Sequence, residues 1–255
     1  MPPSRRRPTG PIRTTTPGPW KHGPIPVIGL VGGIGAGKSE AAARLALLGA
    51  FVIDADKVGH ALLDQRPVRD QVVEKFGDLV LDPSIPEGEP PGIDRRVLSA
   101  IVFKNPSALK SLEAILHPQM RHTFEKAVDR VARKGQATAV VLDAAVLFEA
   151  GWDGLCDHVL FLDAPHEVRL DRLKTSRGWD EPMLTEREAA QWPLEKKKGR
   201  ASLVVSNGGT TDELGVAIEL ALKALRPTPR PKAPRQSAPP GPSGPRHRPP
   251  RHRGR

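Results

Sequence analysis

Five short apolar runs recur along the chain, and longer segments with helical periodicity separate them. The runs are apolar at consecutive positions, so both faces of each strand are expected to be buried. This is typical of a parallel sheet covered by helices on both sides, and we therefore predict an α/β fold. The expected strands are residues 27–31, 51–54, 137–142, 158–162 and 203–205.

Helical patterns occupy most of the intervals between these strands. Residues 82–93 are rich in proline and glycine and are expected to form a loop. His117 and Pro118 predict a break in a helix or the start of a new one, because proline lacks the backbone donor and crowds the preceding turn. The expected helices are residues 38–48, 68–76, 95–103, 106–134, 167–175 and 212–225.

The basic residues are concentrated at the two ends of this 255-residue chain, whose net charge is +10. Residues 1–26 and 227–255 together hold 13 of the 39 Lys and Arg, 18 of the 28 prolines and no acidic residue, whereas residues 27–226 carry a net charge of −3. The ends lack the apolar residues that would offset the entropy lost on ordering. We therefore predict disordered, basic, proline-rich tails at 1–24 and 227–255 around a folded domain at 25–226.

The tails have two readings. Their charge could hold RNA or another polyanion weakly and in a salt-dependent manner. Alternatively, they are solvated tails without a defined partner, and no aromatic residue lies among the carboxy-terminal arginines to stack on bases. The sequence leaves both readings open, and it leaves the oligomeric state undetermined.

Cysteine use and hydropathy predict where the protein works. Cys156 is the single cysteine, so no intrachain disulfide can form, which suits a reducing compartment. The arginines near the start are followed by Thr, Gly and Pro rather than by the apolar core of a signal peptide. No run of 18 apolar residues is present. We therefore expect a cytoplasmic protein without membrane association.

The strongest chemical signal is a glycine-rich octet between the first strand and the first helix. It satisfies G-x-x-x-x-G-K-[ST] in strand–loop–helix context, so a chance glycine turn is a weak alternative. Backbone N–H groups of such a loop and the following helix terminus bind phosphates. Lys38 is expected to bridge the β- and γ-phosphates, and Ser39 to take one Mg²⁺ position. The octet is Gly32, Gly33, Ile34, Gly35, Ala36, Gly37, Lys38 and Ser39.

Two carboxylates, Asp54 and Asp56, follow the second strand. Carboxyl ends of parallel strands share one sheet edge, so these side chains are expected near the phosphate loop. One of them could accept the proton of an attacking hydroxyl or hold Mg²⁺ through water. The alternative is an N-cap for the helix that begins near Lys57. A switch GTPase is disfavoured, because no Asn-Lys pair is present for reading a guanine base.

A charge-rich stretch between the fourth and fifth strands contains Arg172 and, beside Gly178, Arg177. A cationic lid over the phosphates would neutralise charge during phosphoryl transfer. The alternative is a pair of solvated charged helices without a catalytic role.

Taken together, these residues resemble the dephospho-CoA kinase family, which completes coenzyme A synthesis. The resemblance spans about residues 25–225. It is carried by "GLVGGIGAGKS", "LGAFVIDADKVGHAL", "LEAILHP", "VLDAAVLFEAGWD", "AAQWPLEKK" and "VVSNGG". It implies a P-loop kinase fold with a five-stranded parallel sheet, a helical acceptor-binding region and a lid at about 176–200. It also implies transfer of the ATP γ-phosphate, with Mg²⁺, to the ribose 3′-hydroxyl of dephospho-CoA.

The resemblance assigns roles to individual residues. Asp56 matches the family aspartate regarded as the base, and Arg177 stands for the lid arginine. His117 and Pro118 match a helix break in the acceptor-binding region, and Asn207 matches the asparagine near adenine. The sequence departs from the family pattern at several positions. His60 stands where an arginine contacting the acceptor is usual, Ser176-Arg177 replaces Arg-Asp, Glu40 replaces threonine and Ala145 replaces proline.

Two alternatives to this function stay open. One is a related small-molecule or nucleoside monophosphate kinase, which would differ in its preferred acceptor. The other is a binding protein whose tails hold RNA and whose nucleotide site only senses ATP.

Overall fold

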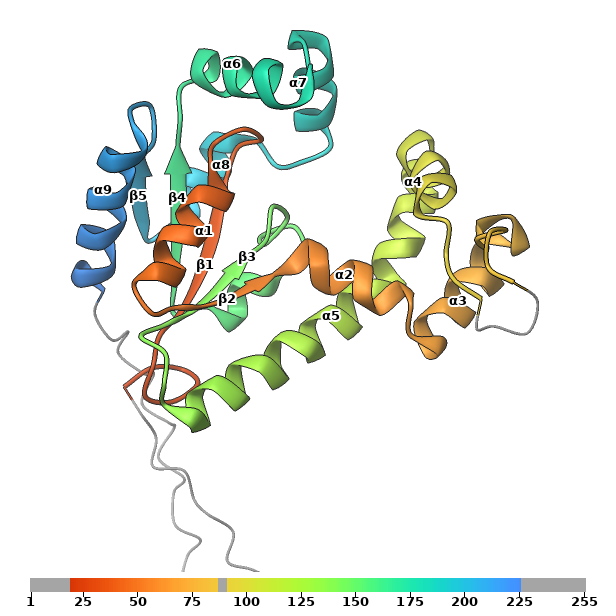
Figure 1. The fold of residues 1–255 in the computed structure, drawn as a ribbon, viewed down its shortest axis with the longest axis horizontal. Helices are drawn as coiled ribbons and strands as arrows, with labels where there is room; N and C mark the ends of the chain where they lie inside the picture. The colour runs from red at the N-terminus through yellow and green to blue at the C-terminus, as the bar shows by residue number, and fades with distance from the viewer. Residues whose placement is uncertain (1–18, 87–90, 226–255) are drawn as a thin grey trace, which may run out of the picture.

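Five parallel strands form one sheet in the order β2-β3-β1-β4-β5 (Figure 1), which confirms the predicted α/β fold and its parallel sheet. The computed structural model describes residues 19–86 and 91–225. Each expected strand is present, although β3 begins at Val140 rather than at 137. The strands are β1 (Val27–Gly32), β2 (Phe51–Asp54), β3 (Val140–Asp143), β4 (His158–Asp163) and β5 (Leu203–Ser206).

The helices divide into those that cover the sheet, those beside β2 and those above the strand ends. Three helices had been given no bounds in the sequence-based prediction: α2, expected only to begin near Lys57, and α7 and α8, which lie in the charge-rich stretch where a helix pair was one alternative. The helices are α1 (Lys38–Leu47), α2 (Ala55–Leu63), α3 (Arg66–Phe76), α4 (Arg95–Lys104), α5 (Pro106–Lys134), α6 (His166–Arg177), α7 (Glu181–Ala189), α8 (Leu194–Arg200) and α9 (Thr211–Ala224), with short 3-10 turns η1 (Asp78–Val80) and η2 (Trp152–Leu155).

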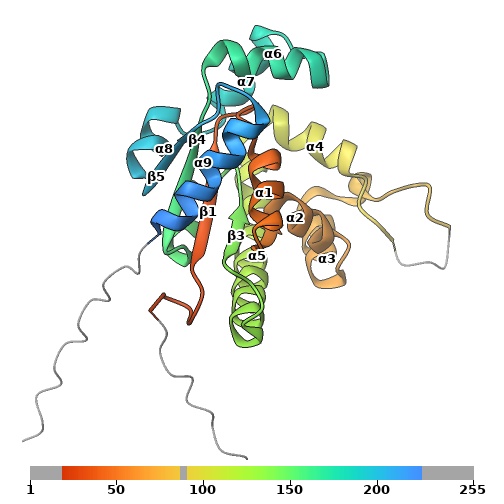
Figure 2. The same ribbon diagram turned by 60° about the vertical axis from the view of Figure 1, so that its left-hand side comes forward.

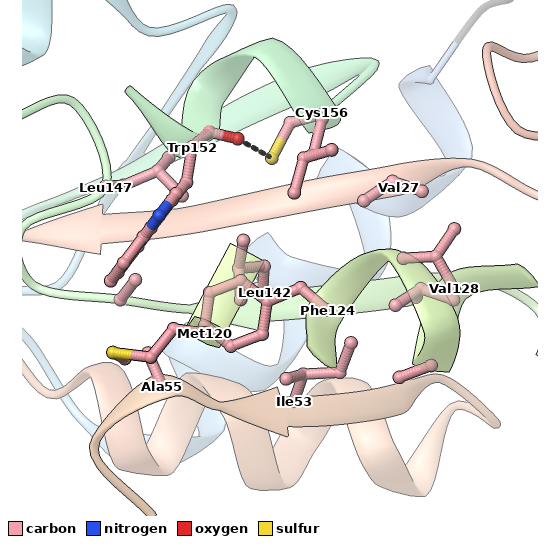
Figure 3. Packing of buried hydrophobic residues seen from close by; sticks show 14 of the residues in the cluster. Val27, Ile53, Ala55, Met120, Phe124, Val128, Leu142, Leu147, Trp152 and Cys156 are labelled. Atoms are coloured by element: carbon pink, nitrogen blue, oxygen red, sulfur yellow. Dashed lines mark hydrogen bonds between the residues drawn. The ribbon is translucent and has the colours of Figure 1, made fainter. Parts of the chain in front are cut away.

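Both faces of the sheet are buried, as continuous apolar strands require. Alternate residues of β1 serve opposite faces: Ile28 and Leu30 pack with α1 and α9, whereas Val27 and Val31 pack with α5. Figure 2 shows α1 and α9 together on one face. The other face holds the larger cluster, part of which is drawn in Figure 3, where Phe124 lies edge-on to Trp152 with ring centroids 5.1 Å apart.

Two regions extend from the sheet and frame the site. Helices α2, α3, α4 and the first half of α5 form a helical region on the β2 side, away from β5 and α9 (Figure 1). Helices α6 and α7 lie above the end of the sheet where β1 leads into α1 (Figure 1). The carboxyl ends of the strands therefore lie between a helical region and a lid-like helix pair.

The predicted helix break at Pro118 is wrong, because α5 continues from Pro106 to Lys134 with Pro118 inside it. A proline removes one backbone hydrogen bond of the helix but leaves the others intact. Met120 and Phe124 follow it directly, and both are buried in the larger cluster. Ile115 and Leu116, before the proline, are partly buried against the same cluster, so burial of apolar side chains on both sides of it compensates for the missing bond.

The amino-terminal end of the domain begins before residue 25. Residues 19–24, which had been expected in the tail, contact the amino-terminal ends of β1 and β4: Trp20 is 9% exposed, and its ring centroid lies 5.8 Å from that of His158. The backbone N–H of Lys21 donates to Asp157 Oδ1 at 2.8 Å, and Val27 N–H donates to Oδ2 at 2.8 Å. The remaining tail predictions concern residues outside those that the structure describes.

Within residues 19–86 and 91–225, none of the helices combines the length and the apolar character needed to cross a lipid bilayer.

Replacing Trp20 with alanine should lower the free energy of unfolding by about 3 kcal/mol, because a large buried side chain is lost and a cavity remains. Denaturant unfolding of the full chain measures this change. Trp20→Phe keeps most of the buried area and should cost less than half as much. An unchanged midpoint for Trp20→Ala would mean that residues 19–24 do not belong to the folded unit.

Candidate active site

The phosphate loop leaves β1 and re-enters the fold as α1. Gly37 is the N-cap of α1 and has a φ of +89°, a conformation that side chains disfavour. A β-carbon at Gly37 would also collide with the amide of Asn207. The loop is closed by a hydrogen bond from the N–H of Ala36 to the carbonyl of Gly33, at 3.0 Å. Glycine is therefore required at Gly37 both by backbone conformation and by space.

Asn207, which follows β5, supports this loop from beneath. It is 5% exposed, and its Nδ2 donates to the carbonyl of Ala36 at 2.7 Å. Its own backbone N–H donates to the carbonyl of Asp163 at 2.7 Å. Asn207 thus connects the phosphate loop to the ends of β4 and β5, where a bound nucleotide would lie.

Two arginines of α6 approach the loop: Arg172, which the sequence offered as part of a cationic lid, and Arg169, which the sequence-based prediction missed. Arg169 is 4% exposed; its guanidinium donates to the carbonyl of Ile34 at 3.1 Å and pairs with Glu188 of α7. Arg172 lies beside Gly37, and its Nη1 is buried without a hydrogen-bond partner among the described residues. Arg169 holds the loop and α7 together, whereas Arg172 has a donor left for a ligand.

Lys38 and Asp143 form the electrostatic centre of the site. Burial lowers the pKa of the Lys38 ammonium; the carboxylates of Asp143 and Asp56 oppose this shift, and the nearby Lys197 and Arg177 add to it. Burial likewise raises the pKa of Asp143 to about 6, against the influence of Lys38. The Oδ1 atom of Asp143 is buried and has no hydrogen-bond partner in the described part of the chain.

The two aspartates after β2 point in different directions. Asp54 caps α2: its Oδ1 accepts from the N–H of Lys57 at 3.0 Å, and its Oδ2 pairs with Lys57 Nζ at 3.2 Å. Although burial opposes it, the Lys57 N–H bond holds the pKa of Asp54 below its ordinary value. Asp56, two residues later in the first turn of α2, lines a cavity instead. Asp54 is therefore the capping residue, and Asp56 is the carboxylate that faces the cavity.

That cavity has a volume of about 300 Å³ and lies between α2, α4, α5 and the loop after β3. Its polar lining includes the predicted Asp56, His60 and His117, together with Arg95 and Glu113, and most of the remainder is apolar. Pro118 is absent from this lining and lies in the interior of α5. The helical region thus brings three of the four predicted acceptor residues to one cavity.

His117 is held in that wall by an aromatic contact. Its ring lies edge-on to Trp152 with centroids 5.0 Å apart. Burial lowers the pKa of His117, and Glu113 opposes the shift only in part. The imidazole is therefore neutral at pH 7, able to donate from one ring nitrogen and accept at the other.

Arg177 is the last residue of α6, immediately before Gly178. It is exposed, its guanidinium lies 5.1 Å from the centre of the Trp179 ring, and its charge contributes to the low pKa of Lys38. The long, exposed side chain of Arg177 thus brings a positive charge within electrostatic reach of the phosphate loop.

Comparison with known proteins identifies the family. The profile described as Dephospho-CoA kinase matches residues 26–213 of this chain. The chain belongs to the dephospho-CoA kinase family. The resemblance stated from the sequence is confirmed.

Individual relatives agree with this membership of the dephospho-CoA kinase family. A dephospho-CoA kinase of Geobacillus kaustophilus is 41% identical over 189 residues, which cover 73% of this chain and 90% of the relative. One of Symbiobacterium thermophilum is 38% identical over 199 residues, covering 78% and 80%. The crystal structure of TT1252 from Thermus thermophilus superposes with a TM-score of 0.65 at 32% identity, covering 79% of this chain and 98% of that one.

In this member of the dephospho-CoA kinase family, a buried lysine fixes the loop that closes the acceptor cavity. Lys197 of α8 is 0% exposed; its Nζ donates to the carbonyl of Ala145 at 2.8 Å, pairs with Glu149 Oε1 at 2.8 Å and donates to Gln191 Oε1 at 3.0 Å. Ala145 lines the cavity. Lys197 ends the motif "AAQWPLEKK" that carried the resemblance, but no role in the site had been predicted for it.

The residues beside the phosphate loop fit a magnesium ion. Ser39 and Asp143 line the same crevice, which has a volume of about 580 Å³, and they supply the oxygen donors that Mg²⁺ prefers. The unpartnered Oδ1 of Asp143 leaves one such donor available. Among the described residues no group of three or more His, Cys, Asp or Glu could hold a metal, as is usual when substrate phosphates supply the other ligands.

Asp143→Asn should make the protein more stable at pH 7, measured without nucleotide and with a chelator present. The pKa of Asp143 is about 6 in the native protein and 3.8 ordinarily, so between these pH values the native state binds a proton that the unfolded chain has released. The native state therefore loses stability as the pH rises from about 4 to 6. Asparagine removes this loss, which we set at about 1–2 kcal/mol after allowing for partial exposure.

Denaturant unfolding at pH 4 and pH 7 measures the effect. The difference between variant and parent should be small at pH 4 and full at pH 7. A variant that is less stable than its parent at both pH values would show that Asp143 is held by favourable contacts rather than strained by burial.

Proposed function

We propose that this protein transfers the γ-phosphoryl group of ATP to the ribose 3′-hydroxyl of dephospho-CoA, forming coenzyme A and ADP. The observation that carries the proposal is the position of Asp56. Its carboxylate lines the apolar acceptor cavity and is also close enough to influence the Lys38 ammonium at the phosphate loop. An acceptor hydroxyl next to Asp56 would therefore face the γ-phosphate.

On the nucleotide side, the loop from Gly32 to Ser39 would bind the phosphates through backbone N–H groups and the positive end of α1. Lys38 would contact the β- and γ-phosphates, and the Arg172 donor beside Gly37 would contact the nucleotide. Arg177 would add charge from the lid. Asn207 would act on the nucleotide through the phosphate loop, because its amide donates to the carbonyl of Ala36.

On the acceptor side, Asp56 would act as the general base. The 3′-oxygen attacks the γ-phosphorus as the bond from phosphorus to the β-bridging oxygen breaks, and the hydroxyl proton passes to the Asp56 carboxylate. His60 and the neutral His117 would hydrogen-bond the acceptor from two sides of the cavity. Apolar walls exclude water, which would otherwise compete as acceptor.

Magnesium would be held by Ser39 and Asp143 together with the phosphates, and when bound it supplies charge neutralisation of the β- and γ-phosphate oxygens. The high pKa of Asp143 fits this role, because a nearby divalent cation would favour the charged carboxylate. A cytoplasmic location and a weak contact of the tails with polyanions stay predictions from the sequence.

Asp56→Asn should reduce kcat for ATP-dependent phosphorylation of dephospho-CoA by about 100- to 10,000-fold, because the amide cannot accept the proton. Coupled measurement of ADP release, with Mg²⁺ and either dephospho-CoA or other hydroxyl acceptors, tests both base and acceptor. The KM for ATP should stay within about twofold of the parent value, since Asp56 lies on the acceptor side.

Asp54→Asn is the matched control. Asparagine also caps helices well, so this variant should retain the activity of the parent with only a modest loss of stability. Equal losses in both variants would point to a structural defect at the end of β2 and remove the case for Asp56 as base. Turnover with another acceptor but not with dephospho-CoA would contradict the proposed substrate.

A further inference from the structure

A second hollow adjoins the acceptor cavity and has a different chemical character. It has a volume of about 490 Å³ and lies between α4 and α7. Arg95 and Ser99 line both hollows, so the two are neighbours along α4. The lining residues of the second hollow are Arg95, Arg96, Ser99, Ala100, Phe103 and Arg187.

Three arginines line this hollow, and its lining contains no carboxylate. Arg95 pairs with Asp64 at 3.0 Å, and the charge of Arg96 also acts on Asp82, but neither carboxylate belongs to the lining. Among the described residues, Arg187 forms no ion pair within 4.0 Å and contacts only aromatic rings through its guanidinium. The lining of the hollow is therefore cationic, which favours an anionic ligand.

Arg187 is oriented by two aromatic rings. Its guanidinium lies 4.3 Å from the centre of the Trp179 ring and 5.4 Å from that of Phe103. Stacking fixes the plane of a guanidinium while leaving its N–H edge available for hydrogen bonds. Because Phe103 is on α4 and Arg187 on α7, this contact also joins the helical region to the lid.

We propose that Arg95, Arg96 and Arg187 bind the diphosphate of the acceptor. This inference rests on the proposed function, because dephospho-CoA bears a diphosphate on the same ribose whose 3′-hydroxyl would face Asp56. The acceptor cavity is largely apolar, and burying two phosphate charges there would be costly without partners. The adjoining hollow offers planar donor groups that match phosphate oxygens.

A ligand in this subsite would also favour closure of α7 toward α4. A diphosphate between Arg95 and Arg96 on α4 and Arg187 on α7 would bridge the helical region and the lid. Arg169 connects α7 to the phosphate loop through Glu188 and Ile34. Occupation of the acceptor site would thus be transmitted to the loop that holds ATP.

Steady-state kinetics of Arg96→Gln and Arg187→Gln in the full chain test the subsite, with Arg133→Gln as control, an exposed arginine at the end of α5. Each variant of the subsite should raise the KM for dephospho-CoA by about 10- to 100-fold, with the KM for ATP within about twofold. Arg187→Lys should recover part of the loss. Arg133→Gln should match the parent.

Calorimetric titration with inorganic diphosphate, in the presence of a non-hydrolysable ATP analogue that fills the phosphate loop, tests the subsite independently of turnover. Diphosphate binding that weakens in both glutamine variants supports the subsite. If dephospho-CoA then proves a poor acceptor, that second result contradicts only the proposed function. If the KM for dephospho-CoA and the binding of diphosphate are unchanged in both glutamine variants, the subsite is overturned. Equal rises in the KM for ATP and for dephospho-CoA would also overturn it, because they would mean that Arg187 only links the lid to α4.

Discussion

Removing the Lys38 ammonium from water is unfavourable, and the arrangement of the sheet provides the charges that make it tolerable. Asp143 ends β3, and β3 lies between β1, which carries the phosphate loop, and β2, which leads into Asp56 at the start of α2. In that order the carboxyl ends bring the carboxylates of Asp143 and Asp56 close enough to act on the lysine. Lys197 and Arg177 act on it in the opposite sense and keep positive charge at the site. A polyphosphate would complete the balance.

The strand order also explains why the residues that hold the site in place come from distant parts of the chain. The loop before α1 is held by Asn207 after β5 and by Arg169 of α6, each through a backbone carbonyl of the loop. The acceptor cavity is closed by the loop after β3, which Lys197 of α8 fixes through Ala145. Phosphate loop and cavity wall are therefore both held by residues that follow β4, so a shift of the lid region would be felt at both.

Local patterns predicted those parts of the fold that depend on neighbours in sequence. Continuous apolar runs gave the strands, and the octet from Gly32 to Ser39 placed the loop. Charge density left the bounds of α7 and α8 unpredicted, because their few apolar residues follow no clear stripe, and a pair of charged helices was only one alternative for this stretch. Trp20 lies among prolines, and its packing depends on His158, far away in sequence. Asp143 and Lys197 lie in family motifs, but their roles depend on strand order and on a buried partner respectively, which no local pattern encodes.

The two aspartates after β2 illustrate how finely the backbone decides function. Asp54 and Asp56 are two residues apart, yet the chain changes from strand to helix between them. Asp54 retains the strand conformation, and its carboxylate turns back to the N–H of Lys57. Asp56 lies in the first helical turn and faces the acceptor cavity. The N-cap that fixes α2 thereby also fixes where the second carboxylate points, so capping by Asp54 is the structural condition for the proposed role of Asp56 as base.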